Sequence, residues 1–270
     1  MIKLLAVDMD GTCLDRKNRF PQKVMEALEA AAQAGITVVP TTGRTLSCLP
    51  RALRQKGGFR YVISSNGAEV TDMQTGKSLY QAQIPAERGA QLLRQAKGCH
   101  LGISTHQAHQ FFLQGRLLYL LGKVLYGKDS ENTKCVKDIA ALLDQNKTDI
   151  EEIQLFYFTQ GSRRKAQAML TEYPELEMAW TKNYVEIFSQ KATKGTALAA
   201  LTSHLGLEKE QVACIGDASN DLPMFQSAGL RFAMGNGISQ LKEQADIVLP
   251  SNDENGVAEA VYRYLLANDR

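Results

Sequence analysis

The feature that most constrains the fold is an apolar run near the start of the chain that ends abruptly in acidic residues. The run Leu4–Val7 leads directly into Asp8–Thr12, with the sequence DMDGT. A short, unbroken apolar run bounded by a turn signal is typical of a strand that is buried on both faces of a parallel sheet. Side chains that follow such strands gather at one edge of the sheet. The chain therefore predicts a parallel sheet with carboxylates at its carboxyl edge.

Strand and helix patterns alternate over the first and last parts of the chain. Predicted strands lie at 3–7, 36–39, 61–64, 211–215, 230–233 and 246–249. Predicted helices lie at 22–34, 46–56, 196–205, 222–227 and 255–266. Such alternation predicts a parallel sheet with helices on both faces, so the expected fold class is α/β.

The middle of the chain, from about residue 82 to 186, has a different pattern. Helical patterns at 87–96, 136–143 and 162–172 are separated by alternating strands such as 153–159 and 184–188. This pattern predicts a small α+β unit inserted into the first one. The expected division is a core domain of residues 1–81 and 188–270 and an inserted domain of residues 82–187.

Two acidic residues after the first strand are suited to phosphoryl transfer. The carboxylate of Asp8 is a candidate nucleophile, which would attack phosphorus and form an aspartyl-phosphate. Asp10 points to the same side if the backbone stays extended, and it is a candidate general acid and base. A pair of aspartates after a strand also occurs in simple turns and helix caps, so other motifs have to support this interpretation.

A later strand ends in the same way, at Gly216–Asp221, with the sequence GDASND. Asp217 is expected beside Asp8, because the carboxyl ends of neighbouring parallel strands converge. Hard oxygen ligands of this kind suit Mg²⁺, which would offset the repulsion between the carboxylates and a phosphate. Asp221 is expected behind them, where it would orient a metal-bound water or Lys194.

Further residues are candidates for binding a phosphate. Thr42 and Gly43 follow the second predicted strand, where a hydroxyl and backbone amides can hold an anion at a helix start. Lys194 offers a point charge and Asn220 an amide donor. Arg44 is a candidate substrate contact, with a structural salt bridge as the alternative. Because these motifs occur together and in order, they predict a magnesium-dependent phosphoryl-transfer enzyme.

Some features favour structural roles. His106 and His109 have a spacing found in metal sites, but no carboxylate lies near them in sequence. The turn signal Asn66–Gly67 fits either a structural turn or the lining of the crevice. The charged segment Arg163–Lys165 is expected on a solvated helix face. The apolar segment Leu117–Leu121 fits either a core or a contact surface.

Composition argues against several classes of protein. The net charge of +2 gives no global sign of a nucleic-acid or membrane-surface partner. The five cysteines are odd in number and lack CxxC spacing, which favours free thiols in the cytoplasm. The apolar start is too short for a signal peptide, and no run reaches the roughly 20 apolar residues that span a bilayer. We expect a cytoplasmic protein.

The ordered motifs resemble those of the haloacid dehalogenase superfamily, and within it the Cof-type sugar-phosphate phosphatases. The resemblance covers essentially the whole chain. It implies a Rossmann-like core and an α/β cap that admits substrate by opening. The segments that carry it are DMDGT at 8–12, TTGR at 41–44, SNGA at 65–68, YVEI at 184–187, TKG at 193–195 and GDASND at 216–221.

The resemblance also implies roles for individual residues. Asp8 would be the nucleophile and Asp10 the general acid and base. Two departures from the family pattern, Thr41 for the more usual Ala and Ala192–Thr193 for Val-Ser, remove no functional group. Magnesium would be held by Asp8, the backbone carbonyl of Asp10 and Asp217, and phosphate would be bound by Thr42, Gly43, Lys194 and Asn220.

The expected function is Mg²⁺-dependent hydrolysis of phosphate monoesters of small metabolites such as sugar phosphates. One alternative is a phosphomutase acting on hexose phosphates, in which residues like those of Gly216–Asp221 are more spread out. A dehalogenase is a weaker alternative, because attack on carbon needs neither Asp10 nor a metal. A catalytically silent binding protein would be expected to lack one of Asp8, Asp10, Lys194 or Asp217. The sequence specifies neither the substrate nor whether the chain is a monomer or a homodimer.

Overall fold

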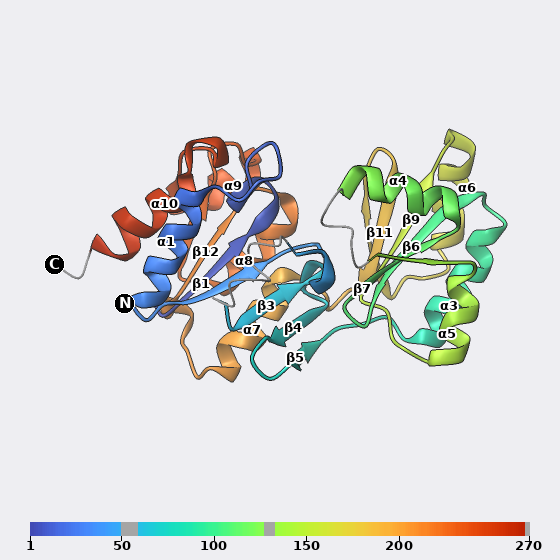
Figure 1. The fold of residues 1–270 in the computed structure, drawn as a ribbon, viewed down its shortest axis with the longest axis horizontal. Helices are drawn as coiled ribbons and strands as arrows, with labels where there is room; N and C mark the ends of the chain where they lie inside the picture. The colour runs from blue at the N-terminus through green and yellow to red at the C-terminus, as the bar shows by residue number, and fades with distance from the viewer. Residues whose placement is uncertain (50–58, 127–132, 268–270) are drawn as a thin grey trace. The chain divides into compact units, whose positions relative to one another are not determined.

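The computed structural model of the chain describes residues 1–49, 59–126 and 133–267 (Figure 1). It divides into two compact units. The core unit comprises Met1–Gly43, Pro50–Gln81 and Thr193–Arg270. The inserted unit comprises Arg44–Leu49 and Ala82–Ala192. Each unit is built on its own sheet.

The core unit is organised around an eight-stranded sheet. Strands from β14 to β3 pair in parallel, and β4 and β5 extend the sheet in antiparallel fashion. This arrangement confirms the predicted α/β class, but the antiparallel extension was not predicted. In order across the sheet the strands are β14 (Ile247–Val248), β13 (Leu230–Ala233), β12 (Val212–Gly216), β1 (Leu4–Asp8), β2 (Thr37–Thr41), β3 (Tyr61–Ser64), β4 (Glu69–Asp72) and β5 (Lys77–Gln81).

Strand β1 is buried on both faces because helices cover both sides of the sheet. Leu5 and Val7 pack with apolar residues of α1 (Gln22–Gln33), α10 (Gly256–Glu259) and the π-helical segment η8 (Ala260–Leu265). Leu4 and Ala6 face α7 (Lys194–His204), α8 (Leu222–Ser227) and α9 (Ser239–Gln244). Burying each large aliphatic side chain contributes about 1.5–3 kcal/mol, so the unbroken apolar run holds β1 at the centre of the sheet.

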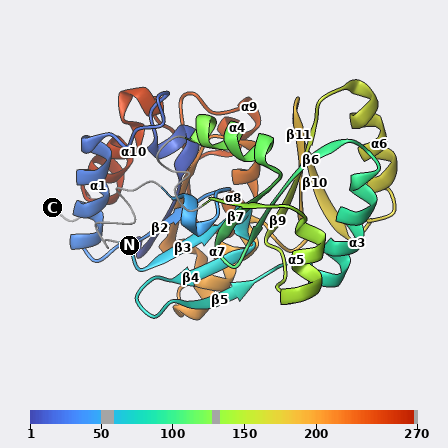
Figure 2. The ribbon, with the colours of Figure 1, turned by 45° about the vertical axis from the view of Figure 1, so that its right-hand side comes forward.

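The inserted unit has a six-stranded sheet with helices α3, α5 and α6 on one face (Figure 2). Its strands pair in antiparallel fashion, except for β7 with β8. In order across the sheet they are β10 (Leu176–Trp180), β11 (Tyr184–Ser189), β9 (Glu152–Tyr157), β6 (Leu101–Gln107), β7 (Gln110–Gln114) and β8 (Thr133–Val136). The helices are α3 (Ala86–Lys97), α4 (Arg116–Tyr126), α5 (Ile139–Asn146) and α6 (Gln160–Leu170).

Two predicted helices differ from the structure. The helix expected at 136–143 starts later, because Val136 ends β8 and the side chain of Asp138 caps α5 by accepting from the amide of Ala141 at 3.2 Å. Of the helix expected at 46–56, the described part is a 3₁₀ turn at Leu46–Cys48, and residues 50–56 lie outside the described residues. Among the helices of the described ranges, none has both the length and the apolar character to cross a bilayer.

Candidate active site

Asp8, the predicted nucleophile, is the last residue of β1 and is 4% exposed. The ammonium of Lys194 donates to Oδ1 of Asp8 at 2.5 Å and to Oδ1 of Asp221 at 2.6 Å. Lys194 is the first residue of α7, whose start is fixed by reciprocal hydrogen bonds between Thr193 and Thr196. The cap formed by Thr193 and Thr196 thus places the buried ammonium of Lys194 beside Asp8 at the end of β1.

Asp217 follows β12, which is the parallel neighbour of β1 in the sheet. The Thr12 hydroxyl donates to Oδ1 of Asp217 at 2.8 Å. Gly11 has φ +87°, and a Cβ on this residue would lie 2.4 Å from Oδ2 of Asp217. A side chain at this position would collide with the Asp217 carboxylate, and the left-handed backbone also favours glycine. Gly11 therefore lets the DMDGT loop pass close to Asp217, where the Thr12 hydroxyl orients the carboxylate.

Asp221 lies behind the other acidic side chains and is fully buried. Its Oδ1 accepts from Lys194, and its Oδ2 accepts from the backbone amides of Asp217 and Ala218 at 2.9 and 3.0 Å. Since both oxygens are hydrogen-bonded, Asp221 is arranged to hold Lys194 and the Asp217 backbone in place. The contact with Lys194 is the one that the sequence predicts for Asp221, and its role in the reaction stays a prediction.

Among the described residues, this cluster holds three carboxylates and the ammonium of Lys194. Oxygens of Asp8, Asp217 and Asp221 lie within 4.8 Å of one another, and Lys194 is the ammonium bound among them. Burial raises the pKa of Asp8 well above its usual range; Lys194 opposes this rise, and the carboxylates of Asp221 and Asp217 add to it. Burial also raises the pKa of Asp217. Burial alone would lower the pKa of Lys194, but the carboxylates of Asp221 and Asp8 raise it above its ordinary value.

The donor set of the cluster fits a magnesium ion. Carboxylate oxygens are the ligands that Mg²⁺ prefers, and a divalent cation would stabilise the ionised forms that burial disfavours. Asp8 and Asp217 are the side chains suited to this role, since Asp221 is already engaged through both oxygens.

Three of the residues predicted to bind phosphate lie after β2 and β12, the two strands that flank β1 in the sheet. Thr42 follows β2 and is buried, and its amide donates to the carbonyl of Ile63 at 2.9 Å. Asn220 belongs to the 3₁₀ segment η6 (Ser219–Asp221), and its Nδ2 donates to Oδ1 of Asn66 at 3.0 Å. At Gly43, a Cβ would lie 3.0 Å from Oδ1 of Asn66. Gly43 therefore leaves space for the side chain of Asn66. For this residue the sequence fits either a structural turn or the lining of the crevice.

Asp10 and Arg44 are the two remaining candidate residues. Asp10 is exposed within η1 (Met9–Cys13), two residues beyond Asp8. Arg44 is the first residue of the inserted unit, and its Nη1 donates to the carbonyl of Cys48 at 3.4 Å. This bond to a backbone carbonyl tests neither of the two roles predicted for Arg44.

Two asparagines that the sequence did not single out hold the loop after β1. Asn236 Nδ2 donates to the carbonyl of Gly11 at 2.8 Å, and its Oδ1 accepts from the amide of Asn252 at 2.9 Å. Asn252 Nδ2 donates to the carbonyl of Leu14 at 2.7 Å. The one local signal is that Asn236 stands between two glycines, a pattern shared with ordinary turns.

The cysteines carry no role in this site. All five lie in the described ranges as thiols, outside any disulfide. Burial raises the pKa of the Cys13 and Cys214 thiols well above the usual range, which keeps them protonated and poorly nucleophilic.

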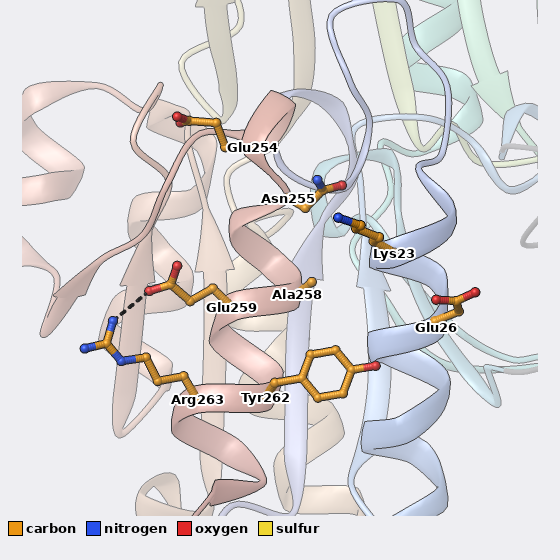
Figure 3. Close-up of a pocket in the computed structure, with 8 residues that line it drawn as sticks. All are labelled: Lys23, Glu26, Glu254, Asn255, Ala258, Glu259, Tyr262 and Arg263. Carbon is orange, nitrogen blue, oxygen red and sulfur yellow. Dashed lines mark hydrogen bonds and ion pairs between the residues drawn. The ribbon is translucent and has the colours of Figure 1, made fainter.

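A surface pocket of about 370 Å³ lies between α1 and the helical segment α10–η8 (Figure 3). Its polar side chains include Lys23, Glu254 and the ion pair of Arg263 with Glu259 at 3.0 Å. None of the side chains predicted to act in catalysis lines it. The chemistry argued above therefore belongs to the carboxyl edge of the sheet and not to this pocket.

Comparisons with known proteins agree with the geometry. Residues 5–261 match the sequence model of the family described as haloacid dehalogenase-like hydrolase. The chain is 29% identical over 279 residues to the 5-amino-6-(5-phospho-D-ribitylamino)uracil phosphatase YwtE of Bacillus subtilis (strain 168), covering 95% of this chain and 96% of that protein. It is 29% identical over 286 residues to the phosphatase YwpJ of the same organism, covering 98% and 100%.

The fold is shared with solved structures of the same kind. A haloacid dehalogenase-like hydrolase from Bacteroides thetaiotaomicron matches with a TM-score of 0.86 and 25% identity, over 97% of this chain and 99% of that one. The resemblance inferred from the ordered motifs is confirmed, and so is the prediction that the chain is a hydrolytic enzyme. From its fold, its motifs and its relatives, the chain belongs to the haloacid dehalogenase-like hydrolases.

Proposed function

We propose that the chain is a Mg²⁺-dependent phosphatase that hydrolyses phosphate monoesters of small metabolites through an aspartyl-phosphate. The observation that carries this proposal is the buried cluster at the end of β1 and β12. There Lys194 bonds Asp8 directly, while Asp217 stands beside them with its carboxylate oriented by Thr12. A nucleophilic carboxylate, a fixed cation and a set of metal ligands are the groups that this reaction needs.

In the first step, an oxygen of Asp8 attacks phosphorus, and the bond from phosphorus to the ester oxygen breaks. Asp10 gives a proton to that leaving oxygen. In the second step, Asp10 takes a proton from water, whose oxygen attacks phosphorus and releases Asp8 and inorganic phosphate. When bound by Asp8, Asp217 and the Asp10 carbonyl, Mg²⁺ supplies positive charge against the phosphate oxygens. Lys194, which donates to Oδ1 of Asp8, favours the ionised carboxylate that attacks and holds it in place.

The expected substrates are small phosphorylated metabolites. The relative YwtE is named for 5-amino-6-(5-phospho-D-ribitylamino)uracil, which carries its phosphate on a ribityl chain. We therefore place phosphorylated sugars and sugar alcohols first among the substrates to test. We further propose that the inserted unit, which the sequence predicts at residues 82–187 between core segments 1–81 and 188–270 and which the structure gives as Arg44–Leu49 and Ala82–Ala192, acts as the cap that selects the leaving group. The cysteine thiols favour a cytoplasmic enzyme. We propose that it acts as a monomer or a homodimer.

The test is release of inorganic phosphate from a panel of sugar phosphates, sugar-alcohol phosphates and nucleotides, with Mg²⁺ and with EDTA. Asp8→Asn is expected to lower kcat on the order of 10³-fold or more, because an amide is not a nucleophile. Asp144→Asn is the matched control, since Asp144 is half exposed on α5 and pairs with Arg94 at the surface. Turnover by Asp8→Asn close to that of the unmodified chain would refute the mechanism. Conversion of a sugar phosphate to an isomer without phosphate release would identify a mutase.

A further inference from the structure

The turn after β3 holds three successive residues in the left-handed region. Ser65, Asn66 and Gly67 of the 3₁₀ turn η3 (Ser65–Gly67) have φ of +47°, +55° and +94°. Left-handed backbone costs a non-glycine residue about 1–2 kcal/mol, and asparagine tolerates it better than most. Such a conformation persists only where its surroundings hold it, and it is common at functional sites. The contacts of this turn therefore indicate whether its side chains serve the site.

The backbone of Asn66 is attached to the loop that follows β2. Its amide donates to the carbonyl of Thr42 at 3.1 Å. The next residue, Gly67, is packed against α7, since a Cβ there would lie 2.2 Å from the carbonyl oxygen of Thr193. Asn66 is thus fixed between two segments that carry candidate phosphate ligands, Thr42 and Lys194.

The side chain of Asn66 reaches a third such segment. Its Oδ1 accepts from Nδ2 of Asn220 at 3.0 Å, across 154 residues of sequence. Asn66 is 6% exposed, and the absent side chain of Gly43 leaves the space that its amide occupies. The segments after β2, β3 and β12 are therefore connected through one buried residue, by its backbone amide and its carboxamide.

This bond decides how Asn220 is presented. A carboxamide has two N–H donors on nitrogen and an acceptor oxygen, and rotation by half a turn exchanges them. When one N–H of Asn220 is used by Asn66, the nitrogen is held on the side of the phosphate-binding residues. Its second N–H then remains for a phosphate oxygen. Without Asn66, the amide is free to turn its oxygen toward the anion, which repels it.

We propose that Asn66 is a positioning residue that orients Asn220 for phosphate binding. The inference rests on the proposed function, because it assumes that Asn220 contacts the phosphate. Asn66 acts through Asn220 and not on the phosphate directly. Its contribution should therefore vanish when Asn220 is removed.

A double-mutant cycle tests this dependence. The four proteins are the unmodified chain, Asn66→Gly, Asn220→Ala and the double variant. Glycine accommodates the left-handed backbone and removes the carboxamide with its Oδ1 acceptor. The readouts are the Kd of inorganic phosphate, measured by calorimetry with Mg²⁺, and kcat and KM for p-nitrophenyl phosphate. Thermal unfolding confirms that each variant is folded.

Each single variant is expected to weaken phosphate binding by about 10- to 160-fold, the range for losing one hydrogen bond to a charged group. The double variant is expected to bind no more weakly than Asn220→Ala alone. Unchanged binding by Asn66→Gly would overturn the proposal, because the residue would then serve only the turn. Additive effects would also overturn it. If Asn66→Gly does not fold, Asn66→Ser, whose hydroxyl is too short to reach Asn220, carries the same expectations.

The Kd of inorganic phosphate, measured apart from hydrolysis, separates this inference from the proposed function. Phosphate that binds without any ester being hydrolysed would refute the phosphatase, while the cycle would still report on Asn66. Hydrolysis with an additive cycle would refute the role of Asn66 alone.

Discussion

Thr12 and Asp217 are 205 residues apart in the sequence, and the Thr12 hydroxyl donates a 2.8 Å hydrogen bond to Oδ1 of Asp217. Thr12 is 1% exposed, so water does not readily replace this donor. Thr12→Val keeps the shape and removes the bond, and we expect the affinity for Mg²⁺ to fall by about 10-fold or more. Thr12→Ser is the control and should retain it. Measurement of activity against Mg²⁺ concentration compares the three proteins, and equal dependence in all of them would contradict the role of Thr12.

Gly11 provides a test of the close approach to Asp217. Gly11→Ala introduces a Cβ 2.4 Å from Oδ2 of Asp217 at φ +87°. Gly35→Ala is a matched control, because Gly35 has the same φ and a Cβ added there would meet no atom within 4 Å. Both variants should lose about 1–2 kcal/mol of stability from the backbone conformation. Only Gly11→Ala should also lose Mg²⁺-dependent activity. Urea unfolding and phosphate release measure the two effects, and similar activities in both variants would disprove the steric argument.

Magnesium should stabilise the folded chain, since it offsets repulsion among the clustered carboxylates of Asp8, Asp217 and Asp221. At 100 times the Kd, binding to the native state adds about 2.7 kcal/mol to the free energy of unfolding. We expect the Tm to rise with MgCl₂ and to return with EDTA. Asp217→Asn should lose most of this rise, and the surface variant Asp144→Asn should keep it. NaCl at equal ionic strength controls for screening, and a rise of the same size in NaCl would argue against a specific site.

His106 should make the stability of the chain depend on pH. The residue is 4% exposed in β6, where its ring meets Phe111 edge-on and its Nδ1 lies 4.0 Å from Oε2 of Glu152. Burial lowers the pKa of His106 from 6.5 to about 3. The unfolded chain therefore binds a proton that the folded chain does not between these values. Stability is full above pH 6.5 and falls as the pH decreases toward 3.

The contribution of His106 between pH 7.5 and 5.5 is about 1 kcal/mol. His106→Gln should remove this part of the pH dependence, while His204→Gln, at the exposed end of α7, should not. Urea unfolding at both pH values gives the difference directly. The same slope in His106→Gln as in the unmodified chain would show that other groups produce it.

The parts of the site that follow from strand geometry were predictable. The apolar runs before Asp8 and Asp217 identify β1 and β12, and these strands are parallel neighbours with Val7 opposite Ile215. Two acidic residues placed just after such partners have to come together. Lys194 could be found because the helix-start signal beside it is local.

The rest of the site depends on contacts that leave no local pattern. Thr12, Asn66 and Asn236 are short polar residues in turns, where they are common for reasons of backbone conformation alone. Their functional contacts reach residues far away in the sequence, so spacing cannot reveal them. The pair β4 and β5 was missed for a related reason, because an antiparallel extension of a parallel sheet depends on which edge is open.

The position of β1 between β2 and β12 has a consequence for how the chain is made. β1 is synthesised before the inserted unit, but its neighbour β12 begins at Val212, after that unit. At the usual rate of roughly 5–20 residues per second, an apolar strand edge stays unpaired for on the order of ten seconds while the intervening segment emerges. The nascent core is therefore exposed to aggregation over that interval, and a chaperone that shields the β1 edge is expected to raise the yield of folded enzyme.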